Sequence, residues 1–318
     1  MINFIIRRFI QSLVVLILMT TVVFIAVRLL PGDPIRMYIT ANTERQYSEE
    51  EIAYVRHQVG LDKPLFLQYI DWIKGIAQGD LGKSILRKEP VSKEIFRRLP
   101  ITAHIGGLAF VFGVMIGVPL GIVTAVRRGK WVDTLLTLFA YIGITIPVFW
   151  LGLLLMYFFG VYLKWLPVMG YTSPFDNFWL STRQLVMPVI CLSFFSIAAT
   201  ARQTRSSMLE VMQQDYIRTA WSKGLRERAV IFTHALKNSL IPIVTLVGMG
   251  VPMIIGGSVL VETVFNLPGL GVLMTNAVFN EDYPYVQGVV LLISTVVLVS
   301  NFVVELTYGW LDPRIRYD

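Results

Sequence analysis

Six long, predominantly apolar stretches of this chain contain no Asp, Glu, Lys or Arg. Each stretch is 18 to 30 residues long, and an α-helix needs roughly 20 residues to cross about 30 Å of hydrocarbon. Backbone groups in lipid must satisfy their own hydrogen bonds, and no stretch alternates as a membrane β-strand would. We therefore expect an all-α integral membrane protein with six transmembrane helices, over residues 9–27, 99–126, 134–163, 184–201, 238–261 and 283–304.

Composition agrees with this pattern and excludes several other classes of protein. The 318 residues are 55% hydrophobic and 15% charged, whereas a soluble protein carries about 25% charged residues. Cys191 is the only cysteine, which excludes a disulfide scaffold and four-thiolate metal sites. The first apolar stretch follows Arg7 and Arg8, as a signal peptide would. It is too long for a signal core and lacks a cleavage site, so we expect a retained helix.

Basic residues are distributed unevenly between the predicted loops. With a cytoplasmic N-terminus, the inner segments hold 14 basic and five acidic residues, and the outer segments hold 13 basic and 14 acidic residues. Cytoplasmic loops carry an excess of Lys and Arg, so we expect both termini in the cytoplasm. The net charge of +7 comes from these basic inner segments, which face the lipid leaflet on the cytoplasmic side. No nucleic acid partner is needed to explain it. The inner segments are 1–8, 127–132, 202–237 and 311–318.

A long outer insert, residues 31–98, separates the first two predicted spans. Ser48 and Glu51 form a capping-box pattern ahead of a helix that ends at Gly60. A second, amphipathic helix is predicted from Leu65 to Ile76. Two short helices are too little to fold alone, so the insert is expected to pack on the membrane domain. It serves either as a spacer or as a surface for an outer partner.

The inner loop, residues 202–237, is predicted to be mostly helical. Apolar residues recur at every fourth position from Met208 to Ala220, and a short helix that starts at Asp215 is expected to end at Gly224. A basic amphipathic helix in this place either lies on the inner leaflet or docks into a groove of a partner. The residues alone do not decide between the two.

The sequence contains little that indicates chemistry. Gly82-Lys83-Ser84 ends like a phosphate-binding loop, but Ala77 stands where that loop requires glycine. The apolar stretches lack the buried ionisable groups that self-powered carriers need. Helix breakers and small residues in spans three and five suit a pliable translocation path, although ordinary tight packing explains them as well. These path candidates are Pro147, Gly248, Pro252, Gly256 and Gly257.

Residues 215–224, followed by 234–242, resemble the cytoplasmic signature loop of ABC importer permeases. More specifically, they resemble the first permease subunit of the dipeptide/oligopeptide/nickel transport family. The signature's usual Glu-Ala-Ala is replaced here by Arg218-Thr219-Ala220. The resemblance covers nearly the whole chain and continues in residues 30–34, 60–65, 79–84, 256–262, 268–271, 282–284 and 312–317.

The resemblance implies a type I ABC importer permease (MetI-like) fold, with 1–30 as the first span, 31–98 as the insert and 99–318 as the permease core. Its implied partners are a homologous second permease, two cytoplasmic ATPase subunits and an extracytoplasmic solute-binding protein. The chain itself would bind no cofactor, because ATP and Mg²⁺ belong to the ATPase subunits. It would carry di- or oligopeptides, or else nickel, glutathione or another small solute, across a prokaryotic inner membrane.

In such a complex the inner loop would be the coupling helix that carries ATP-driven closure to the spans. Its apolar stripe would pack inward or into the ATPase groove, and Arg218, Lys223 and Arg226 would pair with acids there. A proton-coupled carrier and a non-transporting scaffold are the alternatives from other classes. The coupling residues are Asp215, Tyr216, Arg218, Thr219, Ala220, Lys223, Gly224 and Arg226.

Overall fold

The computed structural model describes residues 2–29, 35, 48–250, 252–256 and 258–311, and these are mostly helical. Gly257 and the motifs at 30–34 and 312–317 lie outside or largely outside the described residues. The chain forms two compact units. The first comprises residues 1–102 and 268–318, and the second comprises residues 103–267.

Within the described part of the chain, four helices are each long and apolar enough to cross a bilayer. They are α1 (Ile2–Leu29), α5 (Val91–Val126), α8 (Phe178–Met212) and α15 (Tyr283–Leu311). Each lies over one of the predicted spans, as expected for helix-length runs without charge.

The other two predicted spans contain bends. The helical segment from α6 (Trp131–Thr145) to α7 (Val148–Leu155) and η1 (Met156–Tyr162) turns by 104° at its break, where Pro147 stands. Proline lacks the N–H that would continue the helix, and it disfavours the helical conformation of the preceding residue. The segment formed by α10 (Glu227–Ala229), η2 (Val230–Ala235) and α11 (Leu236–Gly250) bends by 50° before Pro242. Six spans are obtained only if each bent pair crosses the membrane as one.

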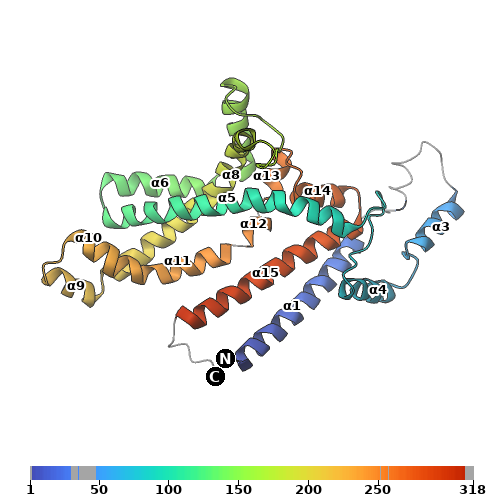
Figure 1. Ribbon diagram of the computed structural model, residues 1–318, viewed down its shortest axis with the longest axis horizontal. Helices are drawn as coiled ribbons and strands as arrows, with labels where there is room; N and C mark the ends of the chain where they lie inside the picture. Colours follow the sequence, from blue (N-terminus) through green and yellow to red (C-terminus); the bar gives the residue numbers. More distant parts are fainter. Residues whose placement is uncertain (1, 30–34, 36–47, 251, 257, 312–318) are drawn as a thin grey trace. The chain divides into compact units, whose positions relative to one another are not determined.

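In the first unit, α1 packs along α15 (Figure 1). The two predicted insert helices are present as α3 (Glu49–Gln58) and α4 (Leu65–Ala77), and both hydrogen bonds of the Ser48 capping box are formed. The α4 helix packs on α1, because the Tyr69 hydroxyl lies 2.8 Å from Thr21 Oγ1. The α4 helix is therefore attached to the C-terminal half of α1.

Two of the motifs that carry the resemblance meet in this unit. Asp282, which precedes α15 and is buried, accepts hydrogen bonds from the Ser84 hydroxyl and, at 3.1 Å, from the Ile85 amide. Thr102 Oγ1 accepts a 2.8 Å hydrogen bond from the Leu270 amide. That amide belongs to the first turn of α14 (Leu270–Phe279), where no intrahelical acceptor is available. The start of α5 and the segment before it are thus joined to the last two helices.

In the second unit, α6, α7 and α11 pack against α8. The second half of α5 also approaches α8 closely, through glycines spaced four residues apart at 113, 117 and 121. A Cβ on Gly117 would lie 2.7 Å from Thr200 Cβ, and a Cβ on Gly121 would lie 2.6 Å from the Ala201 carbonyl oxygen. Such a row of small residues allows two membrane helices to pack backbone to backbone. The unit also contains α12 (Met253–Gly256) and α13 (Val259–Val264).

Candidate functional site

The predicted coupling helix is α9 (Asp215–Ser222), which follows α8 after two residues. Its C-terminus is a Schellman motif, in which the Leu225 amide donates to the Ala220 carbonyl at 3.4 Å and the Gly224 amide donates to the Trp221 carbonyl at 2.9 Å. Gly224 has a φ of +72°. No described atom lies within 4 Å of the position that its Cβ would take. Glycine is therefore required here for the backbone angle and not for space within this chain.

The inner face of α9 belongs to a hydrophobic cluster at the end of α8. Ile217 and Ala220 are 1% and 4% exposed. They pack with residues of three other segments, namely Ala125 of α5, Met208 of α8, and Val230, Ile231 and Ala235 of the α10–η2 segment. We call these seven residues the α9 cluster. Because protein interiors are close-packed, a displacement of α9 must repack all of these segments.

The outer face of α9 carries the other predicted coupling residues. Tyr216 is 43% exposed, and its hydroxyl accepts a 2.8 Å hydrogen bond from Asn238 Nδ2. Ile217, rather than Tyr216, contributes to the buried stripe. Trp221, an exposed aromatic residue outside the predicted stripe, adds apolar area to this face. Also exposed are Asp215, Arg218, Thr219, Lys223, Gly224 and Arg226.

The first turn of α6 is attached to α8 by an ion pair. Arg205 Nε and a terminal guanidinium nitrogen lie 3.0 Å from the two carboxylate oxygens of Asp133. Asp133 also accepts from the Gly129 amide at 3.0 Å and from the Thr137 hydroxyl at 3.2 Å. Bidentate pairs of this kind are geometrically specific. The ion pair therefore sets the register of α6 against α8 near the α9 cluster.

A cavity of about 460 Å³ lies in the second unit between α5, α8, α11 and α12, and the α6–α7 break also contributes to its wall. Its described lining residues carry no charge, and the largest include Phe110, Phe195, Met249 and Met253. At its edge a Cβ on Gly106 would lie 2.0 Å from the carbonyl oxygen of Ile254, so the two backbones are in direct contact there. The cavity suits a passage with an adaptable apolar wall, because methionine is flexible and polarisable.

Residues 117–317 match the family described as "Binding-protein-dependent transport system inner membrane component". Residues 1–106 match the N-terminal region described for the same kind of membrane component. The chain belongs to this family. It is the membrane component of an ABC transporter, a multi-pass permease and not itself the ATPase. Such a permease works in a complex with ATPase and binding-protein partners.

Curated relatives match this permease over nearly its whole length. A probable peptide ABC transporter permease of Sinorhizobium fredii is 40% identical, with 99% of each chain covered. The dipeptide transport system permease of Alkalihalophilus pseudofirmus is 37% identical, with 100% of each chain covered. The di/tripeptide transport system permease of Pseudomonas aeruginosa is also 37% identical, covering 100% of this chain and 99% of its own.

Among solved structures, the inward-facing MetNI methionine ABC transporter is similar to this permease with a TM-score of 0.53. The match covers 69% of this chain and 96% of that chain at 17% identity. At this level of identity the similarity shows the fold, which is the predicted type I permease fold.

The predicted path residues that are described flank the 460 Å³ cavity instead of lining it. Pro147 stands between two lining residues, and Gly248 and Pro252 each lie next to lining residues of α11 and α12. Gly256 lies two positions beyond the lining residue Ile254, and Gly257 is not described. The helix breakers thus position neighbouring side chains, and no periodicity in the sequence distinguished those neighbours from other apolar residues. The glycines at 113, 117 and 121 were also missed, although their four-residue spacing is visible in the sequence.

Proposed function

We propose that this chain is a permease subunit of an ATP-driven importer of di- or oligopeptides, with the 460 Å³ cavity as part of its translocation path. The full-length similarity to permeases named for dipeptide and di/tripeptide transport carries this proposal. Its partners would be a homologous second permease, two cytoplasmic ATPase subunits and an extracytoplasmic solute-binding protein. The membrane is the prokaryotic inner membrane.

Both termini and α9 would face the cytoplasm, and the insert 31–98 would face outward. The basic excess of the inner segments supports this orientation. Cysteine placed at Ser48 should react with an impermeant maleimide in intact cells, whereas cysteine at Ser222 should react only after lysis. Both positions are exposed, and the natural Cys191 is buried and should stay silent. The opposite labelling pattern would show that the orientation is inverted.

The outer face of α9 would dock into a groove of an ATPase subunit. Tyr216 and Trp221 offer apolar area there, and Arg218 and Lys223 offer positive charge for acidic groups. ATP-driven movement of the groove would displace Ile217 and Ala220, and the α9 cluster would carry that displacement into α5, α8 and η2. This chain would thereby convert closure of the ATPase subunits into a rearrangement of its transmembrane helices.

Reconstitution tests the proposal. The two permeases and two ATPases in liposomes, supplied with binding protein, should accumulate labelled dipeptide only with internal ATP. Trp221→Ala should lower uptake and peptide-stimulated ATP hydrolysis together, because an interface aromatic is lost. Phe178→Ala is the control, since it removes another exposed aromatic at the opposite end of α8. Uptake without ATP would refute the importer, and accumulation of nickel but not of peptide would refute the substrate class.

A further inference from the structure

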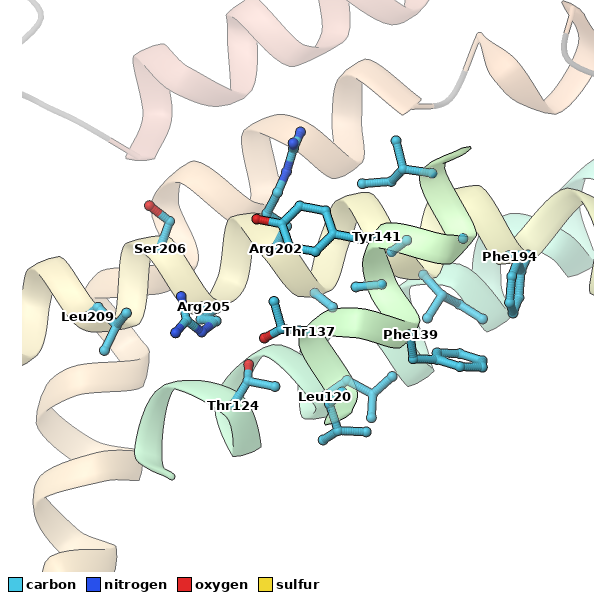
Figure 2. Close-up of a pocket in the computed structure, with 17 residues that line it drawn as sticks. Leu120, Thr124, Thr137, Phe139, Tyr141, Phe194, Arg202, Arg205, Ser206 and Leu209 are labelled. Atoms are coloured by element: carbon cyan, nitrogen blue, oxygen red, sulfur yellow. The ribbon is translucent and has the colours of Figure 1, made fainter. Parts of the chain in front are cut away.

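A second cavity, of about 270 Å³, lies between α5, α6 and α8 in the second unit. Figure 2 shows the side chains that line it. None of its α8 lining residues is shared with the 460 Å³ cavity, so the two hollows lie against different faces of that helix. Along α8 its polar lining residues lie toward the α9 end, where Leu209 also lines it. Arg202, Arg205 and Ser206 lie toward the α9 end, and Phe194 and Ile197 lie toward the middle of the span.

Among the described residues, the polar end of this cavity has one arginine that no carboxylate neutralises. Arg205 is neutralised by Asp133, with both nitrogen–oxygen distances at 3.0 Å. Arg202 is exposed, and no carboxylate among the described residues pairs with it. In Figure 2 the Arg202 side chain extends away from Arg205 and Thr137, and the ion pair of Asp133 is formed with Arg205. The mouth of the cavity therefore favours an anionic group.

The apolar end matches the depth of one lipid leaflet. Arg202 directly follows the charge-free run 184–201, so its guanidinium lies at the level of the lipid headgroups. Phe194 is eight residues away along α8, which corresponds to about 12 Å of helix. Half of the hydrocarbon core is about 15 Å thick. A molecule with an anionic head and an acyl chain spans this distance, and a free inorganic anion would leave the apolar part unfilled.

We propose that this cavity is a binding site for an anionic phospholipid, with the phosphate at Arg202 and part of one acyl chain against Phe194, Ile197 and Gly143. In the orientation proposed above, the lipid belongs to the cytoplasmic leaflet. The proposal does not rest on peptide transport, because it uses only the cavity, its charge and its depth. A lipid bound between α6 and α8 would affect the packing of the same two helices that the Asp133–Arg205 ion pair joins.

Native mass spectrometry of the assembled transporter tests this site. Delipidated complex is mixed with phosphatidylglycerol or with phosphatidylcholine, and retained lipid is counted. The wild type should retain phosphatidylglycerol in preference, and Arg202→Gln should weaken its retention about fivefold, the effect of one arginine near a charged lipid surface. Arg128→Gln is the matched control, because it removes an exposed charge from the α5–α6 turn outside the cavity. Equal effects of the two variants, or equal retention of the two lipids, would overturn the proposal.

Further measurements separate the lipid from other anions. Ala140→Leu fills the apolar part of the cavity, and it should reduce retention of phosphatidylglycerol with an unchanged unfolding temperature of the complex. Inorganic phosphate at millimolar concentration should not displace the lipid, and displacement would identify an anion site only. Displacement by dipeptide would assign the cavity to the substrate path. Either displacement would refute the lipid site.

Discussion

The glycine row of α5 makes a quantitative prediction about the second unit. In Gly121→Ala the new Cβ would lie 2.4 Å from Thr204 Cβ and 2.6 Å from the Ala201 carbonyl oxygen. Ordinary carbon contacts are about 3.5–4.0 Å, so α5 and α8 would have to separate locally by about 1 Å. Overpacking of this kind costs about 1–3 kcal/mol, and the better helix propensity of alanine returns up to ~1 kcal/mol. We expect a net destabilisation of about 1–2 kcal/mol.

The single cysteine of the chain provides the assay. Cys191 lies in α8, lines the 460 Å³ cavity and is 1% exposed, so without ATP and substrate a maleimide reaches it freely only when the helices around it separate. A loss of 1–2 kcal/mol raises the open population, and with it the labelling rate of the subunit band in membranes, about 5- to 30-fold. Gly107→Ala is the control on the same helix, because its Cβ would meet no described atom within 4 Å, and it should label no faster than wild type. Equal labelling of Gly121→Ala and wild type would refute the reasoning.

Three further predictions concern other parts of the chain. Gly224→Val should uncouple peptide uptake from ATP hydrolysis while the subunits still assemble, because a φ of +72° strains a β-branched residue by about 1–3 kcal/mol. Gly224→Asn should retain more uptake than Gly224→Val. Equal uptake by both variants would count against the backbone requirement. Asp133→Asn should destabilise the second unit by about 1–3 kcal/mol, since it leaves Arg205 without its charged partner. Faster labelling of Cys191 would show the destabilisation, and unchanged labelling would contradict it. Burial raises the pKa of the Asp282 carboxyl above its value in the unfolded chain. The stability that this carboxyl contributes is therefore complete below about pH 4 and falls as the pH rises through the raised pKa. Asp282→Asn should remove this part of the pH dependence of thermal unfolding, and identical pH profiles of variant and wild type would argue against it.

The α9 cluster changes how the segment 202–237 is understood. From the sequence, a helix lying on the lipid and a helix docked to a partner were equally acceptable. The structure buries Ile217 and Ala220 within the chain itself and leaves a separate face of the same helix exposed. One short helix can therefore be attached to the spans on one side and be available to a partner on the other.

The sequence by itself determined the membrane class, the places of the long helices and the short helices α3, α4 and α9. These are local properties, because a helix-length run without charge is stable in lipid and a capping box or a terminal glycine acts within one turn. It also located a break at Pro147, since proline removes a backbone donor wherever it stands. It did not give the 104° turn at that break, because the angle depends on what each half packs against.

Only the tertiary structure decided which faces meet. The Ser84–Asp282 hydrogen bond joins residues 198 positions apart, and the Asp133–Arg205 pair joins residues 72 positions apart. Periodicity shows that a helix has an apolar face but not which helix that face contacts, and in a membrane most faces of every span are apolar. For the same reason the two cavities could not be derived from the sequence. Their walls consist of residues that resemble all other apolar residues of the spans until the helices are packed.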